Sequence, residues 1–125
     1  MRNWNWLIKN YFMESIGMIS LNNQVLALVY LEVEYLSNNS WVICKNSKSF
    51  GNGLTETIYP DQLGCPDGAT IRIYVRVVWG DDLIGLEEFN YQSNSTATAN
   101  YVMDSGTLDN QLIFLGVTKK PIPHR

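Results

Sequence analysis

Residues of the types that do catalytic chemistry are few in this 125-residue chain. The single histidine, His124, lies next to the C-terminus in a proline-containing tail, where no neighbouring element would hold it against a nucleophile or a metal. A histidine-based triad is therefore not expected. None of the serines lies in the sequence context of a nucleophile elbow. We expect a protein that is not an enzyme.

The two cysteines, Cys44 and Cys65, permit one disulfide but do not require it. Their spacing lacks CxxC character, and zinc sites of the usual Cys/His kind need more ligands than the chain offers. The sequence favours two free, buried thiols that act as small apolar residues, and it leaves the disulfide open. No metal and no cofactor is expected.

Acidic side chains are the remaining candidates for chemistry. Asp81 and Asp82 face Glu87 and Glu88 across a predicted hairpin. Calcium would need about six to eight oxygen ligands from such loops, and a glycosidase would need two carboxylates in a cleft. Aspartates in turns are most often solvated, because they hydrogen-bond to the backbone there. A calcium site and a small hydrolase therefore remain minor alternatives.

Aromatic residues give a better indication of function. Four tryptophans and seven tyrosines exceed what a core of this size requires. Tyr74 is predicted to lie beside Arg72 and Arg76 on the exposed face of a strand, and exposed Tyr and Arg are common in protein and glycan contacts. The alternative is that the phenol rings lie over the arginine stems and cover the sheet.

These side chains must be positioned by strands, of which residues 70–79 are the clearest. Successive side chains of a strand point to opposite faces. One face of this stretch carries Ile71, Ile73, Val75, Val77 and Trp79, and the other carries Arg72, Tyr74, Arg76 and Val78. This alternation predicts a long antiparallel strand with one face in a core and the other largely in solvent.

Residues 25–36 alternate in the same way, with Glu32 and Glu34 on the face away from the core. Further strands are expected at 16–21, 40–45, 54–59, 84–91, 96–103 and 107–118, with turns at Asn22-Asn23 and Asn38-Asn39. Short strands separated by turn signals predict an all-β domain, a single antiparallel β-sandwich of about seven or eight strands.

The domain is expected to span residues 16–118, between an aromatic N-terminal arm (1–15) and a flexible basic tail (119–125). The arm carries Trp4, Trp6, Ile8, Tyr11 and Phe12, and its pattern fits a helix or a strand. It would cover its own domain, a neighbouring subunit or a lipid surface. Alternatively, Met13 is the true start of translation.

The net charge of −3 and the pI near 5.0 argue against nucleic-acid binding, which needs clustered Lys and Arg. No apolar run approaches the ~20 residues that span a bilayer, and no classical signal peptide is visible. We expect a soluble protein, and its compartment, secretion included, stays open.

From about Ala27 to Leu115 the order of features resembles the C-terminal β-sandwich domain of thiol-activated, cholesterol-dependent cytolysins and the small stand-alone proteins like it. The matching pieces are 27–35 (ALVYLEVEY), Gly51-Asn52-Gly53, 68–73 (GATIRI) and Gly106-Thr107-Leu108. In that family the domain docks on sterol-rich membrane, and a Thr-Leu pair contacts the sterol. The resemblance implies this role for Thr107 and Leu108, without pore formation by this chain alone.

Two functions follow as hypotheses. The first is a non-enzymatic recognition module that binds a membrane or, like a lectin, a glycan surface through loops at one end. Its expected contact residues are Trp79, Leu83, Thr107, Leu108 and Tyr74. The second is a self-assembling structural protein whose oligomer interface is the arm, through Trp4, Trp6, Ile8, Tyr11 and Phe12.

Overall fold

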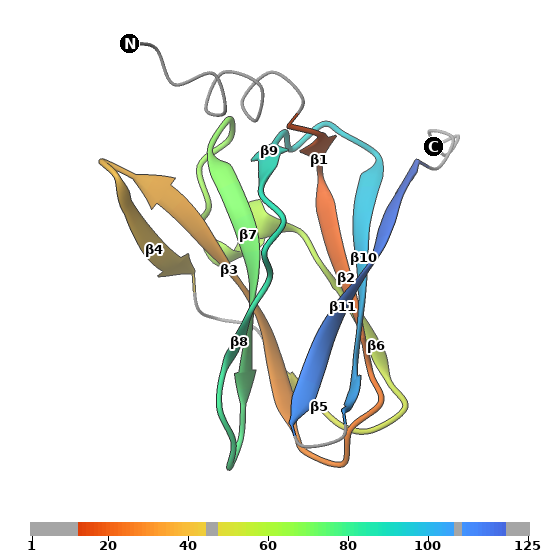
Figure 1. Cartoon of the computed structure of the whole chain (residues 1–125). Helices are drawn as coiled ribbons and strands as arrows, with labels where there is room; N and C mark the ends of the chain where they lie inside the picture. Colours follow the sequence, from red (N-terminus) through yellow and green to blue (C-terminus); the bar gives the residue numbers. More distant parts are fainter. Residues whose placement is uncertain (1–12, 45–47, 107–108, 120–125) are drawn as a thin grey trace, which may run out of the picture.

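The computed structural model of the chain describes residues 13–44, 48–106 and 109–119 (Figure 1). The described residues form strands and one 3-10 helix, which confirms the predicted all-β class. The elements are β1 (Ser15–Ile16), β2 (Met18–Asn23), β3 (Val29–Ser37), β4 (Ser40–Cys44), β5 (Ser49–Phe50), β6 (Thr55–Ile58), η1 (Pro60–Leu63), β7 (Thr70–Val77), β8 (Leu83–Ile84), β9 (Phe89–Tyr91), β10 (Ala97–Ser105) and β11 (Asn110–Lys119). Within these ranges, no helix is long and apolar enough to cross a membrane.

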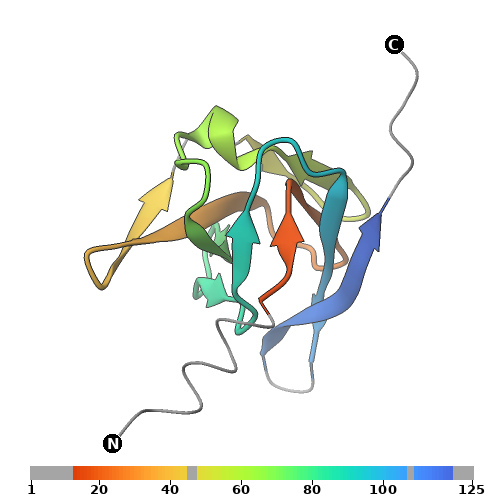
Figure 2. The ribbon, with the colours of Figure 1, turned by 90° about the horizontal axis from the view of Figure 1, so that it is seen from above.

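The strands form two sheets. The first sheet has the order β1-β9-β7-β3-β4, with β5 also paired to β3 and β8 to β7, and the second has the order β11-β10-β2-β6. The view from above shows the two sheets curving around a shared interior (Figure 2). One apolar core joins them, with Leu31, Val33, Ile71 and Ile73 from the first sheet and Ile19, Leu21, Ala99 and Met103 from the second.

The expectation of a wholly antiparallel fold is wrong for two pairings, because β1 pairs with β9 and β2 pairs with β10 in parallel. The cause lies at Gly17, where one extended segment leaves the first sheet as β1 and enters the second as β2. The amide of Gly17 donates to the carbonyl of Ala97 at 2.9 Å. A Cβ at Gly17 would lie 2.1 Å from the carbonyl oxygen of Ser95, so the crossing requires glycine.

The alternation predicted for the central strand is confirmed from Thr70 to Val77, where the apolar side chains are buried and the others are partly exposed. β7 lies between β3 and β9, and pairs with β3 in antiparallel register. The prediction fails at Trp79, which is fully exposed and has a left-handed φ of 64°. The strand ends two residues earlier, so Trp79 leaves the core face and enters a turn.

The other predicted strands are present with changed bounds. The Asn38-Asn39 hairpin is confirmed, and both residues have the positive φ that two-residue hairpin turns require. The stretch 84–91 is not one strand but two short ones, β8 and β9. At Gly85, directly after β8, the N–H still donates to the carbonyl of Ile73 at 3.0 Å, and a Cβ would lie 2.3 Å from the side chain of Ile73.

Several predicted residues lie outside the described part of the chain. They are the arm residues Trp4, Trp6, Ile8, Tyr11 and Phe12, the pair Thr107 and Leu108, and residues 120–125 of the tail. Their roles stay predictions. Lys119, which was assigned to the tail, is the last residue of β11.

Candidate recognition surface

One end of the molecule is organised by Asn23, the fully buried last residue of β2. Its side-chain amide donates to the carbonyl oxygens of Ala27 at 2.9 Å and Phe50 at 3.3 Å. Its side-chain oxygen accepts the backbone N–H of Val25 at 3.0 Å. These bonds replace strand pairing for residues 24–28, which explains why β3 begins at Val29 instead of Val25.

Backbone hydrogen bonds join a second loop to Asn23 and a third loop to Leu28. The N–H of Asn23 donates to the carbonyl of Leu54 at 2.9 Å, and the N–H of Gly53 donates to the carbonyl of Asn23 at 2.6 Å. The N–H of Val78 donates to the carbonyl of Leu28 at 3.0 Å, which ties in the β7–β8 loop. The loops 24–28, 51–54 and 78–82 therefore form one connected end, at the bottom of Figure 1.

Each of these loops presents a large apolar side chain to solvent. The side chains of Leu26 and Leu54 are 93% and 56% exposed, and Trp79 is fully exposed. Leu28 adds a fourth side chain that is about half exposed. We call these four residues the apolar tip. Large exposed apolar side chains on three hydrogen-bonded loops make this end a candidate contact surface.

The hairpin that presents Trp79 is fixed by Asp82. One carboxylate oxygen of Asp82 accepts the backbone N–H of Val77 at 3.1 Å, and the other accepts the hydroxyl of Tyr74. This hydrogen bond to a carboxylate raises the pKa of Tyr74 to about 12. The structure therefore places Tyr74 in contact with Asp82, in the loop that carries Trp79.

Leu83 lies in a groove of about 580 Å³ beside the same hairpin, lined also by Gly80, Asp81, Asp109 and Asn110. The groove brings the β7–β8 loop next to the residues that follow Thr107 and Leu108 in the chain. Whether Thr107 and Leu108 themselves meet Trp79 and Leu83 stays a prediction, because the pair lies outside the described residues. Two aspartates give the groove a negative charge.

On the outer face of the first sheet, the arginine side chains are engaged in ion pairs and ring contacts within the sheet. Nε of Arg72 lies 2.9 Å from a carboxylate oxygen of Glu34, and its guanidinium carbon lies 3.9 Å from the ring centre of Trp41. Nε of Arg76 is likewise 2.9 Å from the carboxylate of Glu32. The alternative of phenol rings over the arginines is therefore confirmed for Arg76, whose guanidinium carbon lies 3.8 Å from the ring centre of Tyr30. The ring over Arg72 is an indole instead.

Glu32 and Glu34 lie on the face away from the apolar core, as predicted, but they are buried there. Glu32 is 0% exposed and Glu34 is 5% exposed. The antiparallel register sets Glu34 opposite Arg72 and Glu32 diagonal to Arg76, so each carboxylate has a charged partner that makes its burial tolerable. Two glutamates spaced by two on one strand and two arginines spaced by four on another were a signal for this pairing.

The acidic residues expected to face each other have separate partners. Asp82 is bound to Tyr74 and Val77, whereas Glu87 accepts the hydroxyl of Tyr101 at 3.1 Å. Burial, with the neighbouring Glu87, raises the pKa of Tyr101. Among the described residues, no group of three or more His, Cys, Asp or Glu side chains is arranged to hold a metal ion.

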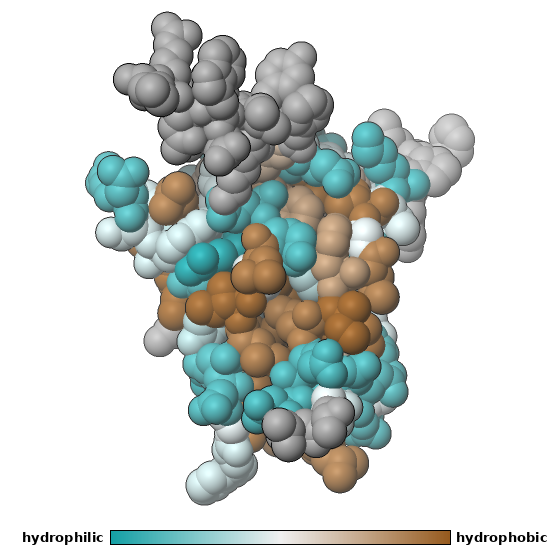
Figure 3. Space-filling model, viewed as in Figure 1, coloured by the Kyte–Doolittle hydropathy of each residue, from teal (hydrophilic) through white to brown (hydrophobic). Residues whose placement is uncertain are grey.

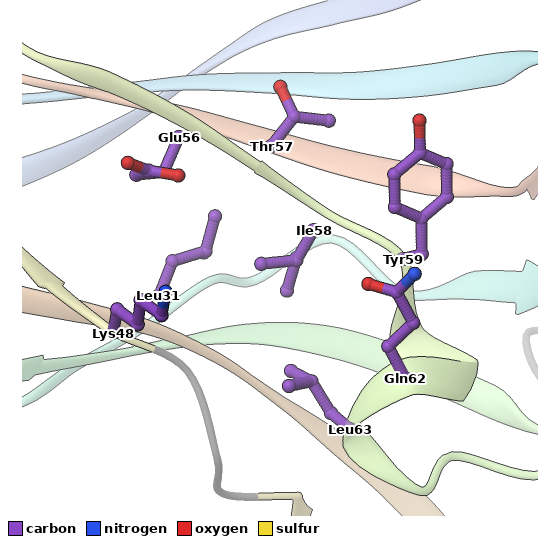
Figure 4. A pocket seen from close by; sticks show the side chains of 8 residues that line it. All are labelled: Leu31, Lys48, Glu56, Thr57, Ile58, Tyr59, Gln62 and Leu63. Carbon is purple, nitrogen blue, oxygen red and sulfur yellow. The ribbon is translucent and has the colours of Figure 1, made fainter.

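A side cavity of about 280 Å³ opens between the two sheets next to β6 (Figure 4). Leu31, Ile58 and Leu63 form its apolar floor, and Lys48, Glu56, Thr57, Tyr59 and Gln62 complete its lining. The sequence analysis missed this cavity, because the register that turns Glu56 to the same face as Leu21 is set by the β2–β6 pairing.

A second apolar surface lies on the side of the molecule, where brown side chains gather across the middle of Figure 3. Leu86 is almost fully exposed and lines a hollow together with Met13, the buried Phe89 and the partly exposed Phe114. Glu14, Glu87 and Glu88 complete the lining of this hollow. The rings of Phe89 and Phe114 are 5.7 Å apart. We call Leu86, Phe89 and Phe114 the apolar side face.

Comparisons of the chain with protein-family models, with curated proteins and with solved structures found no match. The functional proposal therefore starts from the geometry of the described residues.

Proposed function

We propose that the chain is a β-sandwich recognition module that binds a lipid surface through the apolar tip. The observation that carries this proposal is that three loops, hydrogen-bonded into one end around Asn23, each present an exposed apolar side chain: Leu26, Leu54 and Trp79. Because the loops are tied to one another, binding would need little ordering of the chain.

The chemistry of the apolar tip fits the boundary between lipid headgroups and acyl chains. Burying a leucine or tryptophan side chain gains roughly 1.5–3 kcal/mol, and tryptophan is enriched at that depth of a membrane. Several such side chains on one end of a rigid domain give a contact that inserts shallowly. This supports a peripheral, reversible attachment.

The negative charge near the apolar tip favours one charge state of the membrane surface. Asp81 is exposed beside Trp79, and the whole chain carries a net charge of −3. An anionic membrane would repel both, so we propose an electrically neutral surface. The resemblance to the cytolysin domain adds sterol as a component, with Thr107 and Leu108 as its contact residues.

Vesicle co-sedimentation tests the proposal. We expect the chain to bind phosphatidylcholine vesicles, more strongly with cholesterol and more weakly with phosphatidylserine. The variant Leu26→Ser with Trp79→Asn should lose at least about tenfold in affinity, since it removes two apolar side chains that the membrane would bury, while Asn tolerates the left-handed backbone.

The matched control is Ile113→Ser with Leu115→Ser, which removes exposed apolar side chains from β11, away from the tip. This control should bind like the parent chain. Failure to bind any vesicle, or equal loss in both variants, would overturn the proposal. Binding to a glycan array that depends on Asp81 and Asp109 would instead indicate a lectin-like role for the groove.

The second candidate function is self-assembly through the N-terminal arm. The observation in its favour is that Met13, directly after the arm, lines the hollow next to the apolar side face, so residues 1–12 of a neighbouring copy would find an apolar surface there. Light scattering coupled to size exclusion tests this. Deleting residues 1–12 should convert an oligomer into a monomer, and a full-length chain that is monomeric at high concentration would exclude the idea.

A further inference from the structure

The two cysteines lie against each other although they are 21 residues apart in the chain. Cys44 is the last residue of the edge strand β4, and Cys65 follows η1, where its N–H donates to the carbonyl of Pro60 at 3.0 Å. Both side chains are buried, and their sulfur atoms are 2.9 Å apart.

This arrangement needs almost no rearrangement to become covalent. The sulfur atoms would have to approach by about 0.9 Å to reach the bond length of about 2.05 Å. The two thiols come from separate elements, so a bond between them would join β4 of the first sheet to the segment that contains η1. A pair of buried thiols that served as apolar filling would not need to meet sulfur to sulfur.

We propose that Cys44 and Cys65 form a reversible disulfide that clamps η1 onto the first sheet when the chain meets a disulfide oxidant such as glutathione disulfide. One cysteine thiolate attacks a sulfur of the oxidant, which forms a mixed disulfide and releases one glutathione thiolate. The second cysteine thiolate then attacks the protein sulfur of that mixed disulfide. The protein loses two protons and two electrons, and the oxidant leaves as two molecules of glutathione.

The bond would act on the side cavity. Leu63 and Gln62, which line the cavity, belong to η1. Cys65 lies two residues after Leu63, and Cys44 lies four residues before Lys48, which lines the same cavity. Joining the two cysteines would therefore hold η1, which forms one wall of the cavity, against the end of β4, and reduction would release it.

The test starts from the fully reduced, full-length chain, equilibrated at pH 8 with mixtures of reduced and oxidised glutathione. Free thiols are then alkylated under unfolding conditions, and the products are identified by intact mass and peptide mapping. We expect a mass lower by two hydrogens, a Cys44–Cys65 linked peptide, and a thermal midpoint about 10 °C higher than that of the reduced chain.

The single variants Cys44→Ala and Cys65→Ala keep the small apolar volume and should give at most a glutathione adduct, with no rise in the thermal midpoint. If either variant fails to fold, the intact mass and the linked peptide of the parent chain are sufficient to test for the disulfide. Two alkylated thiols after oxidation, glutathione adducts alone, or disulfides between chains would each overturn the proposal.

Hydrogen exchange tests the clamp separately. The amides of Gln62 and Gly64 donate to Tyr59 and Asp61 within the η1 turn, and oxidation should slow their exchange by about tenfold. A disulfide that forms without slowing these amides would overturn the clamping of the cavity wall.

Discussion

The side-chain amide of Asn23 donates a hydrogen bond to the carbonyl of Phe50, 27 residues further along the chain. This contact turns two separate loops into one surface, because the same side chain also fixes residues 25 and 27. The exposed apolar residues of the tip therefore depend on a polar residue that never reaches the surface.

Replacing Asn23 should damage both stability and binding. Asn23→Ala removes three hydrogen bonds and leaves buried backbone groups unpaired, so the free energy of unfolding should fall by about 2–4 kcal/mol. Urea denaturation measures the loss. The control Asn52→Ala removes one partly buried bond, to Val25, and should cost no more than about 1 kcal/mol. Equal costs would refute the central role of Asn23.

Gly17 should be equally intolerant of a side chain. Gly17→Ala places a methyl group 2.1 Å from the carbonyl oxygen of Ser95, at the point where β1 becomes β2, and we expect a loss of at least about 3 kcal/mol. Gly51→Ala is the matched control, because the nearest atom to its Cβ is 3.7 Å away. That variant should change stability by less than about 1 kcal/mol in the same denaturation experiment.

The pairing of Glu32 with Arg76 predicts that removing Arg76 alone destabilises the fold more than replacing both residues. Arg76→Ala leaves a fully buried carboxylate without its cation, and the second oxygen of Glu32 already lacks a partner among the described residues. We expect a clear fall in the urea midpoint. Replacing both residues by leucine should restore much of the stability, because the buried charge is then removed with its partner. A double variant as unstable as Arg76→Ala would contradict this reading.

The hydrogen bond from Tyr74 to Asp82 can be followed by its titration. The pKa of Tyr74 is raised to about 12, so the stabilisation from this bond is complete below about pH 10 and is lost between pH 10 and 12. In Asp82→Asn the carboxylate is gone, and one additional tyrosine should ionise near pH 10 in an ultraviolet titration. Tyr91, whose pKa is raised to about 12 mainly by burial, should not change and serves as the internal reference.

Local patterns predicted the parts of the fold that depend on neighbouring residues. The period of two from Ile71 to Val77 follows from burial of one face, and the Asn38-Asn39 turn follows from the tolerance of asparagine for positive φ. Both are properties of a few adjacent positions, so the sequence alone was sufficient.

Features that depend on contacts between residues far apart in the chain could not be predicted from the sequence. The parallel pairs arise because Gly17 passes close to Ser95, a contact between segments 78 residues apart that no local pattern encodes. The role of Asn23 was hidden for the same reason, since an asparagine before a loop looks like a turn former whatever its side chain contacts. The prediction for Trp79 failed because the period of two ends with the strand at Val77, before it reaches Trp79.

The rate of disulfide formation should depend steeply on pH. Burial raises the pKa of Cys65 well above its usual range, with further increases from Cys44 and Asp61, and burial also raises the pKa of Cys44. Because the thiolate is the attacking species and is scarce below these pKa values, the rate should rise about tenfold per pH unit between pH 7 and 9. Stopped-time alkylation of the chain in excess glutathione disulfide measures this rate. A rate that levels off near pH 8, as for an exposed thiol, would show that the two cysteines react from an opened state in which they are no longer buried together.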